Sequence, residues 1–149
     1  MKKALITSLL MIFSQSFGQI NLEKLNEEFK LHPKPIIIYF YTDWCAYCKI
    51  QEKEIERINT FKERVYFIKL NAETDQVIHF MGDDFNPNKS NNKSTTHDFV
   101  KAFIQSNEQE SYPFWVFLNE NLEVNGKYNG LLTEEQLQGI ISKIKMGTD

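Results

Sequence analysis

Cys45 and Cys48 are the residues of this chain whose type and spacing most directly indicate chemistry. Two cysteines with two residues between them can bring their sulfur atoms within bonding distance across the first turn of a helix, so that the pair alternates between dithiol and disulfide. The sequence contains no further cysteine, which excludes a scaffold of several disulfides and falls short of a four-ligand structural zinc site. We favour a working redox couple; the alternatives are an inert disulfide and half of a metal site shared across a dimer.

The elements around this pair would place Cys45 at the start of a helix. Residues 36–41 are a continuous run of β-branched and aromatic side chains, which is typical of a strand buried on both faces of a sheet. From Cys45 onward, apolar residues recur near one helical face among many charged ones. Unsatisfied backbone N–H groups and the positive end of the dipole favour a thiolate at a helix N-terminus. We therefore expect Cys45 to attack the substrate and the more buried Cys48 to resolve the mixed disulfide.

The remaining periodic segments predict one α/β domain over residues 19–149. A strand at 65–70 follows the helix, and this order requires a parallel crossover. The other expected elements are a helix over 21–30, an antiparallel hairpin of 113–118 with 122–128, and a last helix that begins with a capping box of Thr133 and Gln136. Together they predict a central mixed sheet flanked by helices.

Residues 71–111 depart from this pattern and are interpreted as an insertion before the hairpin. The polar tract at 82–94 predicts a surface loop. A helix is expected after it, since apolar residues recur at helical spacing over 99–104, and Thr95 with Asp98 would cap its start. We expect this helix to pack on the sheet.

The order of these motifs resembles the thioredoxin superfamily. A hydrophobic strand leads into Asp43-Trp44-Cys45-Ala46-Tyr47-Cys48-Lys49 at the start of a helix, and Ser111-Tyr112-Pro113 opens a later strand. The resemblance implies a thioredoxin fold and a thiol-disulfide oxidoreductase that needs no cofactor. It also implies that Pro113 is a cis-proline facing the dithiol, where the backbone of Tyr112 would pair with an extended substrate. Trp44 and Tyr47 would either shape substrate docking or cover the dithiol.

The residue that accepts a proton from the dithiol is not the usual one of this superfamily. Many thioredoxins carry a buried aspartate six positions before the first cysteine, where this chain has Tyr39. We interpret Tyr39 as a core residue, with a hydrogen bond toward the site as the alternative. Glu52 matches a glutamate of exported thioredoxin-like domains similar to the C-terminal domain of the thiol reductant DsbD. It is the candidate proton acceptor, with a solvated helix residue as the alternative. Lys69 matches a lysine that lies near the thioredoxin dithiol.

The first residues of the sequence predict export. Met1-Lys2-Lys3 is followed by an apolar run over 4–13 and then by Ser16 and Gly18, which is the layout of a signal peptide over residues 1–18. A transmembrane anchor would need about 20 apolar residues, and this run is shorter. We therefore expect the mature chain in the periplasm or secreted, where disulfides can form and persist.

The net charge and the positions of the histidines indicate which classes of ligand and partner to expect. The formal net charge is -3 with both signs interspersed, so no basic surface for nucleic acid or an anionic membrane is indicated. His79 and His97 flank the polar tract without a third ligand, and no metal is predicted. The expected partners are thiols and disulfides of exported proteins and an upstream thiol electron donor or acceptor, with the chain itself a monomer.

The expected function is an exported oxidoreductase that reduces, or relays electrons to, disulfides of other exported proteins. The similarity to DsbD-like domains favours the reducing direction. Ala46 and Tyr47, which tune the reduction potential of the pair, match neither the Gly-Pro of ordinary thioredoxins nor the Pro-His of strong oxidants. The alternative hypotheses are a disulfide oxidase or isomerase with the same site, and a partner-binding module in which the dithiol is incidental.

Overall fold

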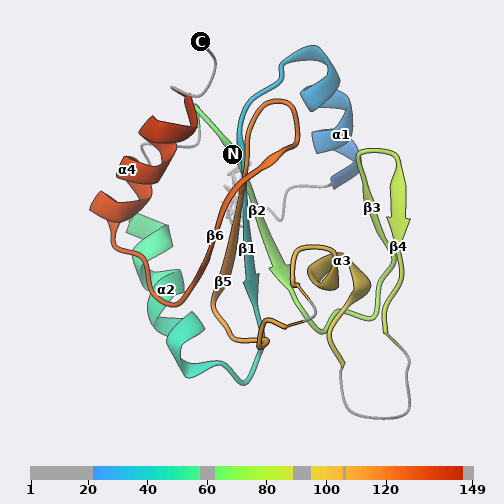
Figure 1. The fold of residues 1–149 in the computed structure, drawn as a ribbon, viewed down its shortest axis with the longest axis vertical. Helices are drawn as coiled ribbons and strands as arrows, with labels where there is room; N and C mark the ends of the chain where they lie inside the picture. The colour runs from blue at the N-terminus through green and yellow to red at the C-terminus, as the bar shows by residue number, and fades with distance from the viewer. Residues whose placement is uncertain (1–21, 58–62, 89–94, 106, 146–149) are drawn as a thin grey trace, which may run out of the picture.

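A four-stranded sheet forms the centre of the molecule, with its strands in the order β2-β1-β5-β6 (Figure 1). The computed structural model describes residues 22–57, 63–88, 95–105 and 107–145, so the expected signal peptide lies outside the described residues. The strands of this sheet are β1 (Ile36–Tyr41), β2 (Tyr66–Asn71), β5 (Phe114–Leu118) and β6 (Val124–Asn129). The helices are α1 (Leu22–Leu31), α2 (Ala46–Arg57), α3 (Asp98–Lys101) and α4 (Glu134–Lys145). None of these described helices has the length and apolar character needed to cross a membrane.

The strand directions agree with the predicted fold class. β1 pairs in parallel with β2 and antiparallel with β5, and β5 pairs antiparallel with β6. The sheet is therefore mixed, with both the parallel crossover and the hairpin that the sequence predicted. Helices α2 and α4 lie on one face of the sheet, and α1 and α3 lie on the other (Figure 1). The α/β fold with a central sheet between helices is confirmed.

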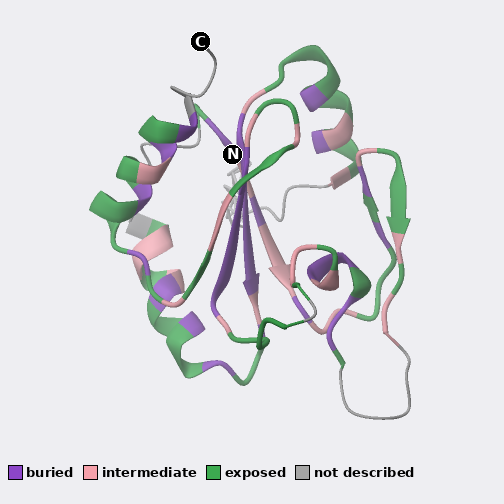
Figure 2. Cartoon of the chain, viewed as in Figure 1, coloured by how far each residue is buried: buried purple, intermediate pink, exposed green. Residues whose placement is uncertain are grey.

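The side chains of β1 alternate between two hydrophobic cores, because successive residues of a strand point to opposite faces. Ile36, Ile38 and Phe40 pack with residues of α1 and α3, whereas Ile37 and Tyr39 pack with residues of α4. All five side chains are fully buried, which explains the uninterrupted apolar run that predicted this strand (Figure 2). Packing on both faces of the sheet therefore fixes the position of β1, and with it the point from which the chain continues to Cys45.

A small two-stranded sheet lies beside α1 and consists of β3 (Ile78–Phe80) and β4 (Asp83–Phe85). Its two-residue turn is Met81-Gly82, where φ is 52° and 96°. Positive φ at both central residues is typical of tight two-residue hairpin turns. The prediction of a surface loop over 82–94 is wrong for residues 83–85, which are paired strand, and residues 89–94 lie outside the described residues. The polar residues of β4 are exposed, so the composition of the tract concealed a strand with a local partner.

α3 is a single turn rather than the longer helix expected over 99–104. Its N-cap is His97, whose Nδ1 accepts a hydrogen bond from the backbone N–H of Phe99 at 3.1 Å. The predicted capping pair of Thr95 and Asp98 is wrong, because the Thr95 hydroxyl donates to a carboxylate elsewhere in the fold. The apolar residues of α3 are buried against the central sheet, as the sequence predicted.

α4 begins at the capping box that the sequence predicted. The backbone N–H of Gln136 donates to Thr133 Oγ1 at 3.3 Å, and the backbone N–H of Thr133 donates to Gln136 Oε1 at 2.9 Å. These two bonds satisfy donors that a helix start would otherwise leave free. The apolar face that follows covers the sheet with Leu137, Ile141 and Ile144.

Candidate active site

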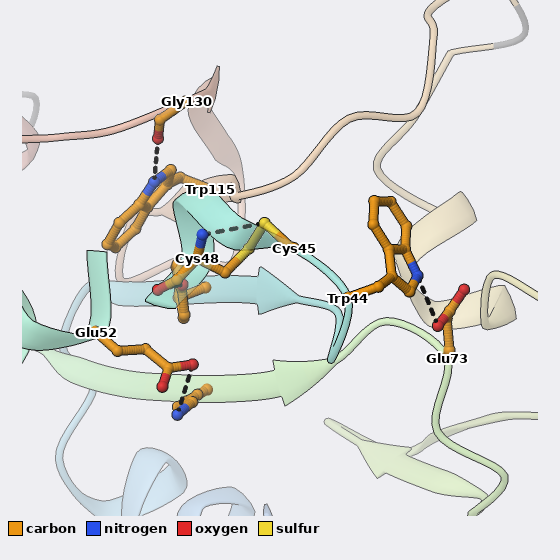
Figure 3. Close-up of a disulfide and its surroundings, with 9 residues drawn as sticks. Trp44, Cys45, Cys48, Glu52, Glu73, Trp115 and Gly130 are labelled. Atoms are coloured by element: carbon orange, nitrogen blue, oxygen red, sulfur yellow. Dashed lines mark hydrogen bonds and ion pairs between the residues drawn. A yellow bond between two sulfur atoms is a disulfide. The ribbon is translucent and has the colours of Figure 1, made fainter. Parts of the chain in front are cut away.

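The cysteine pair lies at the junction between β1 and α2. Cys45 directly precedes α2 and is joined by a disulfide to Cys48 in the first turn, with the two Cα atoms 5.2 Å apart. The backbone N–H of Cys48 donates to Cys45 Sγ at 3.0 Å (Figure 3). Cys45 is 4% exposed and Cys48 is 1% exposed, so the expected order of burial holds by a small margin. The two cysteines therefore lie at disulfide distance at a helix start.

The start of α2 favours a negative charge on Cys45. The N–H of Cys48 that points at Cys45 Sγ is one of the first-turn donors that have no acceptor within a helix. The first turn of α2 contains no acidic residue, so no carboxylate in it offsets the positive end of the helix dipole. After reduction, this donor and the dipole stabilise the Cys45 thiolate, which is the nucleophilic form of the side chain.

Pro113 lies at the same end of the sheet as the dithiol. The Tyr112–Pro113 peptide bond is cis, and Pro113 directly precedes β5. Phe114, the first residue of β5, pairs with Phe40 near the end of β1, from which the chain continues to the dithiol. This pairing brings Tyr112 beside the cysteine segment, where its ring meets the ring of Trp44 edge-on with 6.1 Å between centroids.

Exposed apolar side chains lie next to the buried cysteines. Trp44 is 67% exposed, Tyr47 is 63% exposed and Ile50 is 52% exposed. Large apolar side chains this open to solvent are accessible to a second protein. The docking roles of Trp44 and Tyr47 stay predictions. Sequence reasoning did not single out Ile50, because an isoleucine within a helical pattern usually indicates the core.

Tyr39 fills the core and also contacts the cysteine segment, so both interpretations of it hold. Its side chain is fully buried, with its ring centroid 4.6 Å from that of Trp115. Its hydroxyl donates to the carbonyl oxygen of Cys48 at 3.2 Å. Burial raises the pKa of Tyr39, and the charge of Glu52 and the neighbouring Tyr41 raise it further. The phenol therefore stays protonated near neutral pH and acts as a hydrogen-bond donor.

Glu52 and Lys69 form an ion pair beyond the cysteines. Glu52 Oε1 lies 3.0 Å from Lys69 Nζ, the ion pair marked by the dashed line at Glu52 in Figure 3. The side chains of Glu52 and Lys69 are 31% and 38% exposed. The Lys69 ammonium also lies 4.7 Å from the centre of the Tyr41 ring. The structure thus brings Glu52 and Lys69 together, while the role of Glu52 as a proton acceptor stays a prediction.

A carboxylate that sequence reasoning missed contacts the cysteine segment. The indole Nε1–H of Trp44 donates to Glu73 Oε2 at 3.1 Å (Figure 3). The hydroxyl of Thr95 donates to the other oxygen, Glu73 Oε1, at 2.6 Å. The three residues are far apart in the sequence, so no spacing pattern could have indicated that they meet.

The two histidines considered as metal ligands have separate partners. His79 Nδ1 contacts Asp84 Oδ1 across the β3–β4 hairpin, and this hydrogen bond and charge raise the pKa of His79. His97 is fully buried, and its Nε2 lies 3.0 Å from the carbonyl oxygen of Gln76 while its Nδ1 caps α3. Both side chains therefore have structural hydrogen bonds.

Solved structures of thioredoxins share this fold. Chloroplastic thioredoxin z matches with a TM-score of 0.55 and 19% sequence identity over 84% of this chain and 90% of that one. The germline-specific thioredoxin Deadhead of Drosophila melanogaster matches with a TM-score of 0.53 and 18% identity over 81% of this chain and 89% of that one. Thioredoxin-2, a component of malaria parasite protein secretion machinery, matches with a TM-score of 0.50 and 19% identity over 74% of this chain and 82% of that one. A search of curated proteins gives no match.

The sequence profile of the thioredoxin-like domain family matches residues 22–145, from the first described helix to the last. The match includes the Cys45–Cys48 pair at disulfide distance and the cis-proline before β5. A thioredoxin-like domain with such a pair supports thiol-disulfide oxidoreductase activity at the general level. By fold and by sequence profile, the chain belongs to the thioredoxin-like domain family.

Proposed function

We propose that this chain is an exported thiol-disulfide oxidoreductase that reduces disulfides of other exported proteins and is itself re-reduced by an upstream thiol donor. The observation that carries the proposal is the Cys45–Cys48 pair at the start of α2, with a backbone N–H aimed at Cys45 Sγ. A thiol attacks disulfides as its thiolate, and this donor favours that form. The similarity of the motif to DsbD-like domains supports the reducing direction.

Reduction of a substrate proceeds by two thiol-disulfide exchanges. The Cys45 thiolate attacks one sulfur of the substrate disulfide, so that a mixed disulfide forms, the substrate S–S bond breaks, and one substrate thiolate leaves. Cys48 then loses its proton, for which Glu52 is the candidate acceptor, and attacks Cys45 Sγ. This second step releases the other substrate thiolate and forms the Cys45–Cys48 disulfide. Two electrons pass to the substrate, and a donor dithiol restores the pair by the reverse sequence.

The substrate would bind along the segment that contains Tyr112 and Pro113. Proline has no N–H to donate, and the extended backbone before it can pair with an extended peptide. The exposed rings of Trp44 and Tyr47 would supply apolar contacts beside this peptide. A disulfide in such a peptide would lie next to Cys45.

The reduction potential of the pair tests the direction of electron transfer. The protein would be equilibrated with mixtures of reduced and oxidised glutathione or dithiothreitol, and the free thiols of Cys45 and Cys48 would be counted by alkylation and mass spectrometry. We expect a potential below about -200 mV, in the range of reducing thioredoxin-like proteins. A potential near about -120 mV, that of a dedicated oxidant, would contradict the reductant and support an oxidase.

The N-terminus of the mature protein tests export. The basic start, the apolar run over 4–13 and the small residues Ser16 and Gly18 support cleavage before Gln19. N-terminal sequencing of the protein from the periplasm or the medium should therefore begin at Gln19. The variant Leu9→Arg, which interrupts the apolar run, should remain uncleaved as a control. Retention of the unmutated chain in the cytoplasm with Met1 intact would refute export.

The length of the segment between β2 and β5 favours a second candidate, a partner-binding module in which the dithiol is incidental. The double variant Cys45→Ser with Cys48→Ser separates the two functions in an affinity purification from the exported fraction. A binding module would retain its partner without the cysteines. An oxidoreductase would lose its covalently held partners, which is the result we expect.

A further inference from the structure

We propose that Glu73 is a positioning residue that holds Trp44 ready for a protein substrate at the dithiol, and that Thr95 completes this contact. The inference rests on the proposed function, because Trp44 is the residue through which Glu73 would act on substrate binding. Glu73 does not touch the cysteines in any contact that we describe; its effect would pass through the indole of Trp44.

The carboxylate of Glu73 joins two segments that are distant in the sequence. Its Oε2 accepts the indole N–H of Trp44 at 3.1 Å (Figure 3). Its Oε1 accepts the hydroxyl of Thr95 at 2.6 Å. Glu73 itself is fixed just beyond β2, where its backbone N–H donates to Asn71 Oδ1 at 2.9 Å. Both carboxylate oxygens are therefore occupied, and one of them orients Trp44 next to Cys45.

A second contact supports the same ring from the side of Tyr112. The ring of Tyr112 lies edge-on to that of Trp44 at an interplanar angle of 81°. The hydroxyl of Thr96 donates to Glu110 Oε2 at 2.5 Å and lies 3.4 Å from the hydroxyl of Tyr112. Trp44 is thus held between Glu73 and Tyr112, and both holding residues contact the segment that leads into α3.

Because Trp44 is exposed, its contacts with Glu73 and Tyr112 should affect substrate binding more than the stability of the fold. A side chain that is 67% exposed contributes little buried area to the core, so its contacts add little to the stability of the fold. An exposed ring without such contacts would change rotamers freely and would lose that freedom when a substrate binds. A ring held in advance avoids this loss. Removing the hold should therefore weaken the binding of a protein substrate and leave the chemistry at Cys45 unchanged.

Four variants of the full chain separate these effects. Glu73→Leu removes both hydrogen bonds, whereas Glu73→Gln keeps an acceptor for the indole and a polar group for Thr95. Glu123→Leu is the matched control, because the Glu123 carboxylate bonds only to Asn119 among the described contacts. Asn119 follows β5 beside the start of β1, whereas the dithiol follows the end of β1. Thr95→Val removes one of the two bonds and serves as a milder second variant if Glu73→Leu folds poorly.

The variants would be compared on a protein disulfide and on a small one. Turnover of insulin with dithiothreitol as the electron donor gives KM and kcat, and the reaction of the reduced protein with 5,5′-dithiobis(2-nitrobenzoate) gives the rate of attack on a disulfide too small to need Trp44. We expect Glu73→Leu to raise the KM for insulin about fivefold, the scale of one lost hydrogen bond. We expect kcat and the small-disulfide rate of Glu73→Leu to stay within about twofold of the unmutated chain. The KM for insulin should be close to that of the unmutated chain in Glu73→Gln and Glu123→Leu, and intermediate in Thr95→Val.

The indole N–H signals in a ¹H–¹⁵N spectrum report on the hold directly. The sequence has two tryptophans, so the Trp44 signal should shift in Glu73→Leu while the Trp115 signal stays in place. An unchanged KM in Glu73→Leu, or an equal loss on insulin and on the small disulfide, would overturn the inference. Inactivity of the unmutated chain on both disulfides would instead overturn the proposed function.

Discussion

The side chain at position 39 determines whether a base lies there to take a proton from the dithiol, and in this chain it is Tyr39. An aspartate, which many thioredoxins carry at this position, can take a proton from the second cysteine. The phenol of Tyr39 has a pKa that burial raises, and its hydroxyl already donates to the carbonyl oxygen of Cys48. Tyr39 therefore anchors the start of α2 and does not act as a base. The proton of Cys48 must go elsewhere, and Glu52 is the candidate.

Replacing Tyr39 by phenylalanine should remove this anchor and keep the ring in the core. We expect the free energy of unfolding of the oxidised protein to fall by about 1 kcal/mol, the net worth of a buried hydrogen bond. Urea unfolding measures the change, with Tyr128→Phe on the exposed edge strand as the control. Equal stability of Tyr39→Phe and the unmutated protein would mean that the hydrogen bond contributes nothing.

Replacing Glu52 by glutamine tests the proton acceptor. We expect the reduced variant to close the Cys45–Cys48 disulfide at least about tenfold more slowly near neutral pH, because a positioned base commonly contributes ~10²-fold or more. The rate would be followed by stopped-flow mixing with an oxidised substrate at several pH values. Glu56→Gln, on an exposed position of the same helix, should react as the unmutated chain does. A Glu52→Gln variant with an unchanged pH profile would leave Glu52 only its ion pair with Lys69.

At the scale of elements, the β3–β4 hairpin carries a pH-dependent contact. The hydrogen bond and the charge of Asp84 raise the pKa of His79 above its usual value of 6.5. A raised pKa in the folded state means that protonated His79 stabilises the folded protein fully below about pH 6.5. This contribution is lost as the pH rises through the raised pKa. Because both side chains are exposed, salt should weaken it.

An NMR titration of the His79 ring measures this shift. We expect a pKa above 6.5 in the unmutated chain and a return toward 6.5 in Asp84→Asn, since the asparagine carries no charge. A His79 pKa that is the same in both proteins would show that Asp84 has no effect on it.

Periodic patterns predicted the long elements of this chain well and the short ones badly. The apolar run of β1 and the capping box of α4 each depend on neighbouring residues, so the sequence contains the whole signal. The single turn of α3 has His97 as its N-cap, which is not a common N-cap residue, and the other ring nitrogen of His97 contacts the carbonyl oxygen of Gln76, far from it in the sequence. The β3–β4 hairpin was missed because two of the three residues of β4, Asp83 and Asp84, are polar, and because the turn has no strong signal besides Gly82.

At the scale of the whole molecule, described residues between β2 and β5 form part of the core. Phe99 of α3 is fully buried, and its ring lies 5.8 Å from that of Phe40 on the central strand. Rings of Phe80 and Phe85 from the small hairpin lie 5.1 Å and 4.9 Å from Phe99. Described residues of the segment interpreted as an insertion therefore cover one face of the sheet, and Glu73 of the same segment holds Trp44.

Replacing Phe99 by alanine should accordingly destabilise the whole protein. We expect a loss of about 3–5 kcal/mol in the free energy of unfolding, the usual cost of removing a buried phenylalanine ring. Val77→Ala is the control in the same segment, because Val77 is 45% exposed and should change stability by less than about 0.5 kcal/mol. Denaturant unfolding compares the two. A small loss in Phe99→Ala would show that this segment is an appended loop.

The sequence placed the cysteines at a helix start but could not show what surrounds them. The position of Cys45 and Cys48 at a helix start follows from the order of strands and helices, which local patterns predict. The place of Pro113 was implied by the resemblance to the thioredoxin superfamily. Glu73 and Thr95 reach the site only because the chain between β2 and β5 folds back over the sheet. Contacts between segments so far apart leave no periodic trace, and the structure alone reveals them.

Trapping of mixed disulfides tests the central claim, that Cys45 attacks substrates and Cys48 resolves them, most directly. The variants Cys48→Ser and Cys45→Ser would be expressed with the full sequence, and thiols would be blocked on lysis. Covalent partners would then be identified by mass spectrometry with and without reductant. The account predicts several exported proteins bound through Cys45 in Cys48→Ser and few or none in Cys45→Ser. Equal trapping by both variants, or no trapping by Cys48→Ser, would contradict it.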